Sequence, residues 1–238
     1  MESGNPLLDD YVLGLTGASR PKVCFLPSAS GDADHYIVRF YRAFPADRCE
    51  ASHISFFRRE QGPEDLRAHL LEQDLIYVGG GSVVSLLGVW RAHGVDEILR
   101  EAWQRGVVLC GLSAGSLCWF SDAVTGFHGA PRVVEGLGLL PFSNCVHYEP
   151  HSSRRRAYHD FIRAGTRGGY AAEDGAALHF VGTELSRVIA SRPEARGYRL
   201  DAMGERVVEM RIATTYLGDS QAPPLIPLPE AMSTAVAA

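Results

Sequence analysis

The sequence predicts an α/β fold, a mostly parallel and doubly wound sheet with helices on both faces. Short apolar runs rich in Val, Ile and Leu alternate with helix-forming segments of about ten residues along the first half of the chain. Polar or glycine-rich turns follow these runs, where parallel sheets place their sites. The 238 residues contain no repeat and no internal linker, so we expect one domain with a sizeable core.

The first half of the chain is expected to alternate strand and helix. The expected strands are apolar runs bounded by turn residues, at 22–27, 51–57, 74–78 and 107–110. The expected helices open at capping or helix-opening residues (Asp32 or Asp34 before the second) and cover 7–14, 34–44, 63–71, 83–90 and 95–104. A further helix is expected to follow directly on the run at 107–110.

The second half is less regular. Residues 122–140 are rich in glycine and are expected to be irregular. Further elements are expected as strands at 144–148, 169–172, 176–181 and 187–191, a basic helix from 152 or 153 to 163, and a closing hairpin over 197–212. The tail from 213 to 238 contains the Pro-rich run PPLIPLPE and is expected to be partly disordered, which places the folded domain at 1–212.

Composition excludes some classes of protein. The formal charge of −5 is mild and no basic patch stands out, so nucleic acid is not expected as a partner. The sequence shows no charged-then-apolar leader and no apolar run of membrane-spanning length. Five cysteines, an odd number without a C-x-x-C pair, indicate reduced core thiols, and three of them (Cys24, Cys110 and Cys145) lie in apolar runs. We therefore expect a cytoplasmic protein.

The strongest motif is G-x-S-x-G at residues 111–115. It lies between a buried strand and an apolar run, which is the setting of a nucleophile elbow with Ser113 at the turn. The N–H of Ala114 would then point to the position of an oxyanion. An ordinary tight turn with an unreactive serine is the alternative.

A reactive serine needs a base and a carboxylate that orients it. The downstream candidates for the base are the histidines at 128, 147, 151, 159 and 179, and His147 is favoured because it ends a predicted strand. Glu173 and Asp174 close the next strand and are both candidates for the acid, although an acidic pair before Gly175 is also typical of a plain turn. The order Ser, His, acid differs from that of the α/β-hydrolases.

Three other patterns have competing interpretations. The run Gly79–Gly80–Gly81 is suited to a second oxyanion donor, and a phosphate site is disfavoured because no Walker motif follows. A metal site at His147 and His151 is disfavoured because Pro150 prevents their alignment on a helix. The arginines at 154–156 form either a solvated face or a site for a substrate carboxylate.

Taken together, YVGGGS, GLSAGS, a strand-ending histidine and an acid before glycine resemble the dipeptidase E family of aspartyl dipeptidases, which is related to cyanophycinase. The resemblance covers residues 20–210 and implies a class I glutamine amidotransferase-like fold. It implies Ser113 as nucleophile, His147 as base and Glu173 as acid, with Asp174 as the alternative. It further implies oxyanion donors at Gly81 and Ala114, and substrate contacts from Gly80, Ser82 and Arg154.

These expectations describe a serine peptidase that cleaves small peptides without a metal or an organic cofactor, with N-terminal Asp as the preferred residue. This chain has Ser82 where the family has Asn, and Val146 and Tyr148 where the family has Pro and Phe around the histidine. The alternatives are an esterase or amidase that acts on a non-peptide acyl substrate, and a non-catalytic binding protein of the same fold. The oligomeric state is left open.

Overall fold

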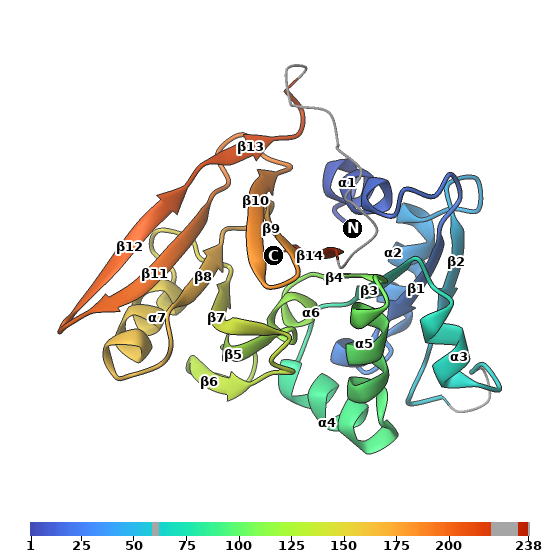
Figure 1. Cartoon of the computed structure of the whole chain (residues 1–238), viewed down its shortest axis with the longest axis horizontal. Helices are drawn as coiled ribbons and strands as arrows, with labels where there is room; N and C mark the ends of the chain where they lie inside the picture. The colour runs from blue at the N-terminus through green and yellow to red at the C-terminus, as the bar shows by residue number, and fades with distance from the viewer. Residues whose placement is uncertain (59–61, 220–232, 238) are drawn as a thin grey trace.

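The structure is a computed structural model that describes residues 1–58 and 62–219 and the backbone of 233–237 (Figure 1). It contains two β-sheets. One has eight strands in the order β13-β10-β9-β14-β4-β3-β1-β2, and the other has six in the order β12-β11-β8-β7-β5-β6. The candidate site lies where these two sheets meet.

The eight-stranded sheet contains the parallel strands that the sequence predicts. Its strands are β1 (Lys22–Leu26), β2 (Glu50–His53), β3 (Leu75–Val78), β4 (Val108–Gly111), β9 (Ala176–Val181), β10 (Glu184–Ala190), β13 (Thr214–Tyr216) and β14 (Ser233–Ala237). Strands β2, β1, β3 and β4 pair in parallel, whereas β9 runs antiparallel to both β10 and β14.

Helices cover both faces of this sheet, as expected for a doubly wound fold. They are α1 (Leu7–Leu15), α2 (Asp34–Ala43), α3 (Leu66–Leu71), α4 (Val83–His93) and α5 (Val95–Gln104), and the short 3-10 helix η1 (Ser28–Ser30) follows β1. Alternate residues of β1 enter different cores: Val23 and Phe25 pack in the core that contains residues of α1 and α2, and Cys24 and Leu26 in the core that contains residues of α4 and α5.

The six-stranded sheet contains β5 (Phe120–Thr125), β6 (Arg132–Glu135), β7 (Leu140–Val146), β8 (Gly169–Ala172), β11 (Gly197–Met203) and β12 (Arg206–Ile212). Helix α7 (Ser153–Arg163) packs on this sheet through Tyr158 and Ile162, which are one helical turn apart and buried. The side chain of Ser152 caps α7 by accepting the Arg155 N–H at 3.1 Å.

The predicted α/β architecture and the closing hairpin over 197–212 are confirmed, because β11 and β12 pair antiparallel over that range. Several local expectations are corrected. The helix after Ser113, α6 (Ala114–Leu117), has only one turn, and the region 122–140, expected to be irregular, contains most of the β5–β6 hairpin. Neither Asp32 nor Asp34 caps α2, whose N-cap position is Ala33; the Asp32 side chain instead accepts the Phe57 N–H.

The tail from 213 to 238 also differs from the expectation at two places. Residues Thr214–Tyr216 pair with β10, and Ser233–Ala237 pair with β9 and touch β4 at a single register position. The sheet therefore includes two short strands from the region that the sequence assigned to a partly disordered tail. Residues 220–232, which hold most of the Pro-rich run, lie outside the described residues.

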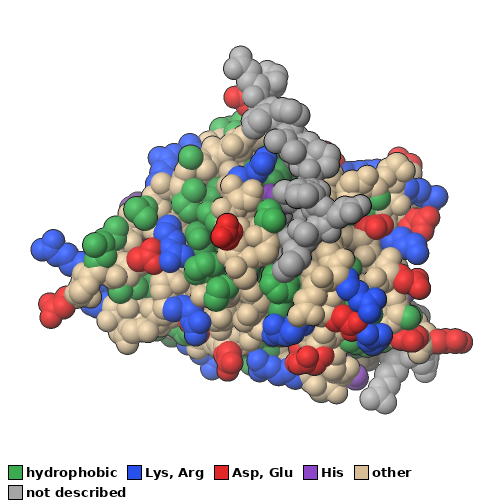
Figure 2. All heavy atoms as spheres, viewed as in Figure 1, with side chains coloured by type: hydrophobic (Ala, Val, Ile, Leu, Met, Phe, Trp, Pro, Cys, Tyr) green, Lys and Arg blue, Asp and Glu red, His purple; other side chains and the backbone are tan. Residues whose placement is uncertain are grey.

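All five cysteines are buried and unpaired, which agrees with reduced core thiols. Burial raises the pKa of the Cys24 thiol to about 12, so this sulfur is unreactive. Figure 2 shows acidic and basic side chains interspersed over the described part of one face. In the described residues no helix is both long and apolar enough to cross a membrane.

The packing around Gly111 generates a stability prediction. A Cβ at Gly111 would lie 2.4 Å from the carbonyl oxygen of Gly115 and 2.8 Å from that of Val78, and backbone atoms cannot give way cheaply. We expect Gly111→Ala to lower the free energy of unfolding by about 3 kcal/mol, as measured by urea denaturation.

The matched control is Gly88→Ala in the exposed middle of α4, where no atom lies within 4 Å of the new methyl group. This change should raise the free energy of unfolding by up to about 1 kcal/mol, because alanine favours a helix over glycine. Equal unfolding midpoints for Gly111→Ala and the native chain would contradict the packing described.

Candidate active site

Ser113 occupies a strained turn between β4 and α6. Its φ of 53° and ψ of −112° are rare for a residue with a side chain, and strain of this kind is typical of a nucleophile elbow. Two glycines make the turn possible, because a Cβ at Gly115 would lie 2.3 Å from the carbonyl oxygen of Val78, and Gly111 is equally enclosed. The predicted elbow is therefore present.

The glycine run after β3 lies against this elbow. A Cβ at Gly80 would lie 3.4 Å from the Ser113 Cβ, and Gly81 has a φ of 140° with the Ala29 carbonyl oxygen 2.2 Å from its Cβ position. Only glycine fits at Gly81. Among the described residues, the N–H groups of Gly81 and Ala114 donate no backbone hydrogen bond, so both are free to bind a ligand oxygen.

Ser82, the next residue, is buried and has a structural partner on each side. Its hydroxyl accepts the Ser85 N–H at 3.1 Å, which caps α4, and forms a hydrogen bond of 2.8 Å with His128 Nε2. The Ser85 hydroxyl also donates to it at 3.0 Å, so its predicted contact with a substrate competes with three existing hydrogen bonds.

His147 follows β7 and reaches the serine. Its Nε2 lies 3.0 Å from Ser113 Oγ, and its Nδ1 lies 2.5 Å from Asp174 Oδ1. The residue has a φ of 55°, and the N–H of Tyr148 donates to the Ala172 carbonyl at 3.1 Å, which fixes the turn after β7. Ser113, His147 and Asp174 thus form a continuous chain of hydrogen bonds, in the order that a serine nucleophile requires.

The structure corrects the expectation that Glu173 contacts His147. The Glu173 carboxylate accepts the Tyr198 hydroxyl at 2.6 Å and the Arg196 N–H at 3.0 Å. Asp174, one residue later, faces the histidine, and its own N–H donates to Glu149 Oε1 at 2.9 Å. Glu173 therefore anchors the turn that presents Asp174.

The charge of Asp174 is stabilised in place. The hydrogen bond from His147 is the largest effect and lowers the pKa of the Asp174 carboxyl below its ordinary value. Burial raises this pKa by less than the hydrogen bond lowers it, and the charges of Arg192 and Arg154 lower it further. The side chains of His147 and Asp174 are 39% and 49% exposed, so solvent and a small ligand can reach them.

These residues line a cavity of about 370 Å³, which we call the triad cavity. Ser113, His147 and Asp174 form part of its wall, together with Arg39 and Arg192. No cluster of His, Cys, Asp or Glu suited to a metal ion occurs in the described residues.

The other histidines considered for the base lie elsewhere. Burial lowers the pKa of His179 to about 4, and its Nδ1 is hydrogen-bonded to the Tyr11 hydroxyl. His159 is paired with Glu209 at 2.7 Å, and His128 with Ser82. His151 is exposed in the loop before α7.

Arg154 does not line the triad cavity. Its Nη1 donates to the Val146 carbonyl at 3.4 Å, and its Nε lies 3.3 Å from the Cβ position of Gly126. Arg155, the next residue, stacks between the rings of Tyr148 and Tyr198 and pairs with Glu209. The arginine run is therefore not simply a solvated face.

Comparison with known proteins identifies the family. The model of peptidase family S51 matches residues 1–188. The chain belongs to peptidase family S51. It is 44% identical over 219 residues to a protein named uncharacterized peptidase YgaJ from Bacillus subtilis (strain 168), covering 92% of this chain and 94% of the relative.

Two further proteins extend the comparison. Peptidase E from Streptomyces coelicolor is 31% identical over 145 residues, which are 58% of this chain and 56% of that protein. The crystal structure of a peptidase from an acI-B1 Actinobacterium matches with a TM-score of 0.62 at 19% identity, over 87% of this chain and 92% of the other, and supports the fold. The predicted resemblance to the dipeptidase E family is confirmed, and the chain is a serine-type peptidase of family S51.

Proposed function

We propose that this S51 peptidase hydrolyses short peptides through an acyl-enzyme formed on Ser113, in the manner of a dipeptidase E. The observation that carries the proposal is the hydrogen-bonded chain from Ser113 Oγ through both ring nitrogens of His147 to Asp174 Oδ1. Serine is a poor nucleophile without a base, and this arrangement supplies the base and the group that orients it.

In the proposed reaction, Ser113 Oγ attacks the scissile carbonyl carbon while His147 Nε2 takes the hydroxyl proton. The carbon–nitrogen bond then breaks, and the protonated histidine gives that proton to the leaving amine. A water molecule next attacks the serine ester, again with His147 as the base, which releases the acyl half and restores Ser113. Asp174 keeps the Nδ1 proton of the ring in place through both steps.

The tetrahedral intermediates carry a negative oxygen that needs hydrogen-bond donors. We assign this role to the N–H groups of Gly81 and Ala114, which flank Ser113 and have no backbone acceptor among the described residues. Gly80 supports this assignment, because its missing side chain lets the glycine loop approach the Ser113 Cβ.

For the acyl half of the substrate we propose an N-terminal aspartate. One relative is named Peptidase E, and the sequence resembles that of the aspartyl dipeptidases. Arg154 remains the proposed partner of the aspartate side chain: it lies in the first turn of α7 close to His147, and its charge helps to lower the pKa of Asp174. Within the described part of the chain, its guanidinium has only a long hydrogen bond to a main-chain oxygen, at 3.4 Å, to exchange for a carboxylate.

The proposal is tested with the purified native chain, a panel of dipeptides with acidic or neutral N-terminal residues, and simple esters. We expect release of the C-terminal amino acid from Asp-X dipeptides, and a loss of roughly 10⁴-fold or more in kcat for Ser113→Ala with an unchanged melting temperature. Cleavage of esters without any peptide cleavage would favour the esterase alternative. Peptide cleavage by folded Ser113→Ala at the native rate would contradict the role of the serine.

The two neighbouring acids provide a matched pair of variants. We expect Asp174→Asn to lower kcat by up to about 10⁴-fold, because the ring of His147 then loses its tautomer preference. Glu173→Gln should retain most activity and cost about 1 kcal/mol of stability, because its partners Tyr198 and Arg196 lose a charged acceptor. Kinetics and thermal melts of both variants check this, and an inactive Glu173→Gln beside an active Asp174→Asn would assign the role to Glu173.

A further inference from the structure

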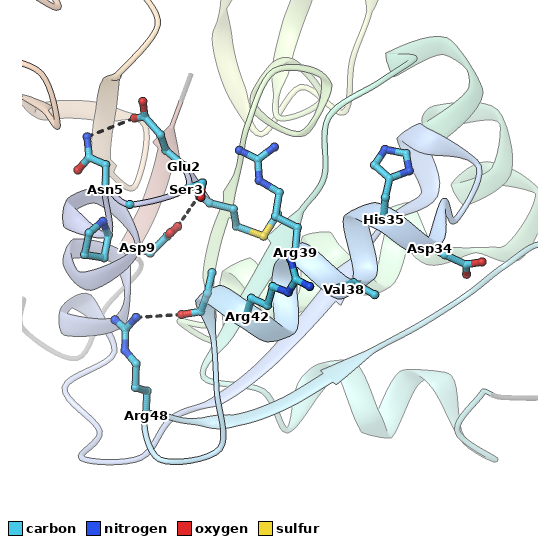
Figure 3. Close-up of a pocket in the computed structure, with 14 residues that line it drawn as sticks. Glu2, Ser3, Asn5, Asp9, Asp34, His35, Val38, Arg39, Arg42 and Arg48 are labelled. Carbon is cyan, nitrogen blue, oxygen red and sulfur yellow. Dashed lines mark hydrogen bonds and ion pairs between the residues drawn. The ribbon is translucent and has the colours of Figure 1, made fainter.

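Beside the triad cavity lies a larger one of about 850 Å³, which we call the arginine cavity after Arg39, Arg42 and Arg48 in its wall (Figure 3). The two cavities share three lining residues, Met1, Glu2 and Arg39. In Figure 3, Arg39 extends from α2 towards the N-terminal segment that carries Glu2 and Ser3. Arg39 therefore lies between the two cavities and lines both.

Most charged groups along the two cavities are already paired. The pairs are Glu2 with Arg192, Asp9 with the amino group of Met1, Asp34 with Arg58, Arg48 with Asp10, and Asp174 with His147. Among the described residues, Arg39 and Arg42 form no ion pair and no hydrogen bond through their guanidinium groups, and both are exposed. Because they are three residues apart on α2, they lie on one face of this helix. The two neighbouring cavities therefore have an excess of positive charge at Arg39 and Arg42.

The triad cavity lies on the histidine side of Ser113. Its walls include His147 and Asp174, but within the described chain they do not include Gly81 or Ala114, the proposed oxyanion donors. In serine peptidases the histidine passes its proton to the leaving amine, so the leaving half of the peptide lies on the histidine side. A peptide bound at Ser113 would thus direct its leaving half into the triad cavity and towards Arg39.

We propose that Arg39 is a specificity residue that binds a carboxylate of the leaving half of the peptide. The inference rests on the proposed function and adds a substrate class to it, peptides that carry a negative charge on the leaving side. Arginine suits this role because its planar guanidinium can bind a carboxylate through two parallel hydrogen bonds. Arg42 lies beyond Arg39 in the arginine cavity and raises the local positive potential.

The carboxylate has two possible sources, the C-terminus of a dipeptide and the side chain of an acidic residue. Four substrates with the same acyl half distinguish them: Asp-Leu, Asp-Leu-amide, Asp-Glu-amide and Asp-Gln-amide. We expect native kcat/KM to be roughly tenfold higher for at least one carboxylate-bearing substrate than for its neutral counterpart. Arg39→Gln should remove that advantage mainly through KM and leave the neutral substrates nearly unchanged.

The matched control is Arg20→Gln. Arg20 precedes β1, at the amino end of the parallel strands, whereas Ser113 follows the carboxyl end of β4. It pairs loosely with the exposed Glu50 at 3.8 Å, so its loss should change none of the four rates. A loss confined to Asp-Leu assigns Arg39 to the C-terminal carboxylate, and a loss confined to Asp-Glu-amide assigns it to an acidic side chain; both support the inference.

Two results would overturn the inference. Equal effects of Arg39→Gln on charged and neutral substrates, or no effect on any of them, would do so while leaving the proposed function intact. If the native chain cleaves none of the four substrates or the wider dipeptide panel, the proposed function fails and the inference fails with it.

Discussion

The close approach of three backbone segments beneath Ser113 is the constraint on which the rest of the site depends. Gly111 ends β4, Gly115 lies in the single turn of α6, and both touch the carbonyl of Val78 at the end of β3. There is no room for a methyl group at either position, so the abrupt turn at Ser113 requires glycine at both 111 and 115. The strain at Ser113 is held in place because the two glycines that flank it pack closely against the backbone of Val78.

That turn also links the two sheets. Ser113 follows a strand of the eight-stranded sheet, whereas His147 and Asp174 follow β7 and β8 of the six-stranded sheet. Helix α6 is the short connection between them, and a buried hydrogen bond of 3.1 Å from the Asn144 amide to the Ser116 hydroxyl ties α6 to β7. The 3.0 Å contact between Ser113 and His147 is therefore set by how one sheet docks on the other.

Much of this architecture could be predicted from the sequence, because local chemistry decides it. Buried parallel strands such as β3 are continuous apolar runs, and α4 follows the glycine run with Ser82 as its cap. The β5 strand could not be separated from the helix after Ser113, because residues 114–120, from α6 to the first residue of β5, are all buried and leave no periodic pattern.

The choice between Glu173 and Asp174 could not be made locally either. Both acids directly follow β8. Which of them faces His147 depends on Tyr198 and Arg196, which lie more than twenty residues away and bind Glu173, so that Asp174 turns towards His147. The position of Asp174 directly before Gly175 was the available signal, since Gly175 has a φ of 89° and lets the turn present the preceding side chain. Arg39 gave no signal, because only the folded chain brings α2 to the edge of the triad cavity.

The central claim is that Ser113 is the activated nucleophile of this S51 peptidase. The most direct measurement is mass spectrometry of the native chain after reaction with a fluorophosphonate, which phosphonylates activated serines, followed by mapping of the modified peptide. We expect a single phosphonyl group, located on Ser113, and no modification of the acid-denatured chain. Modification of a different residue in the native chain, or none at all, would contradict the claim.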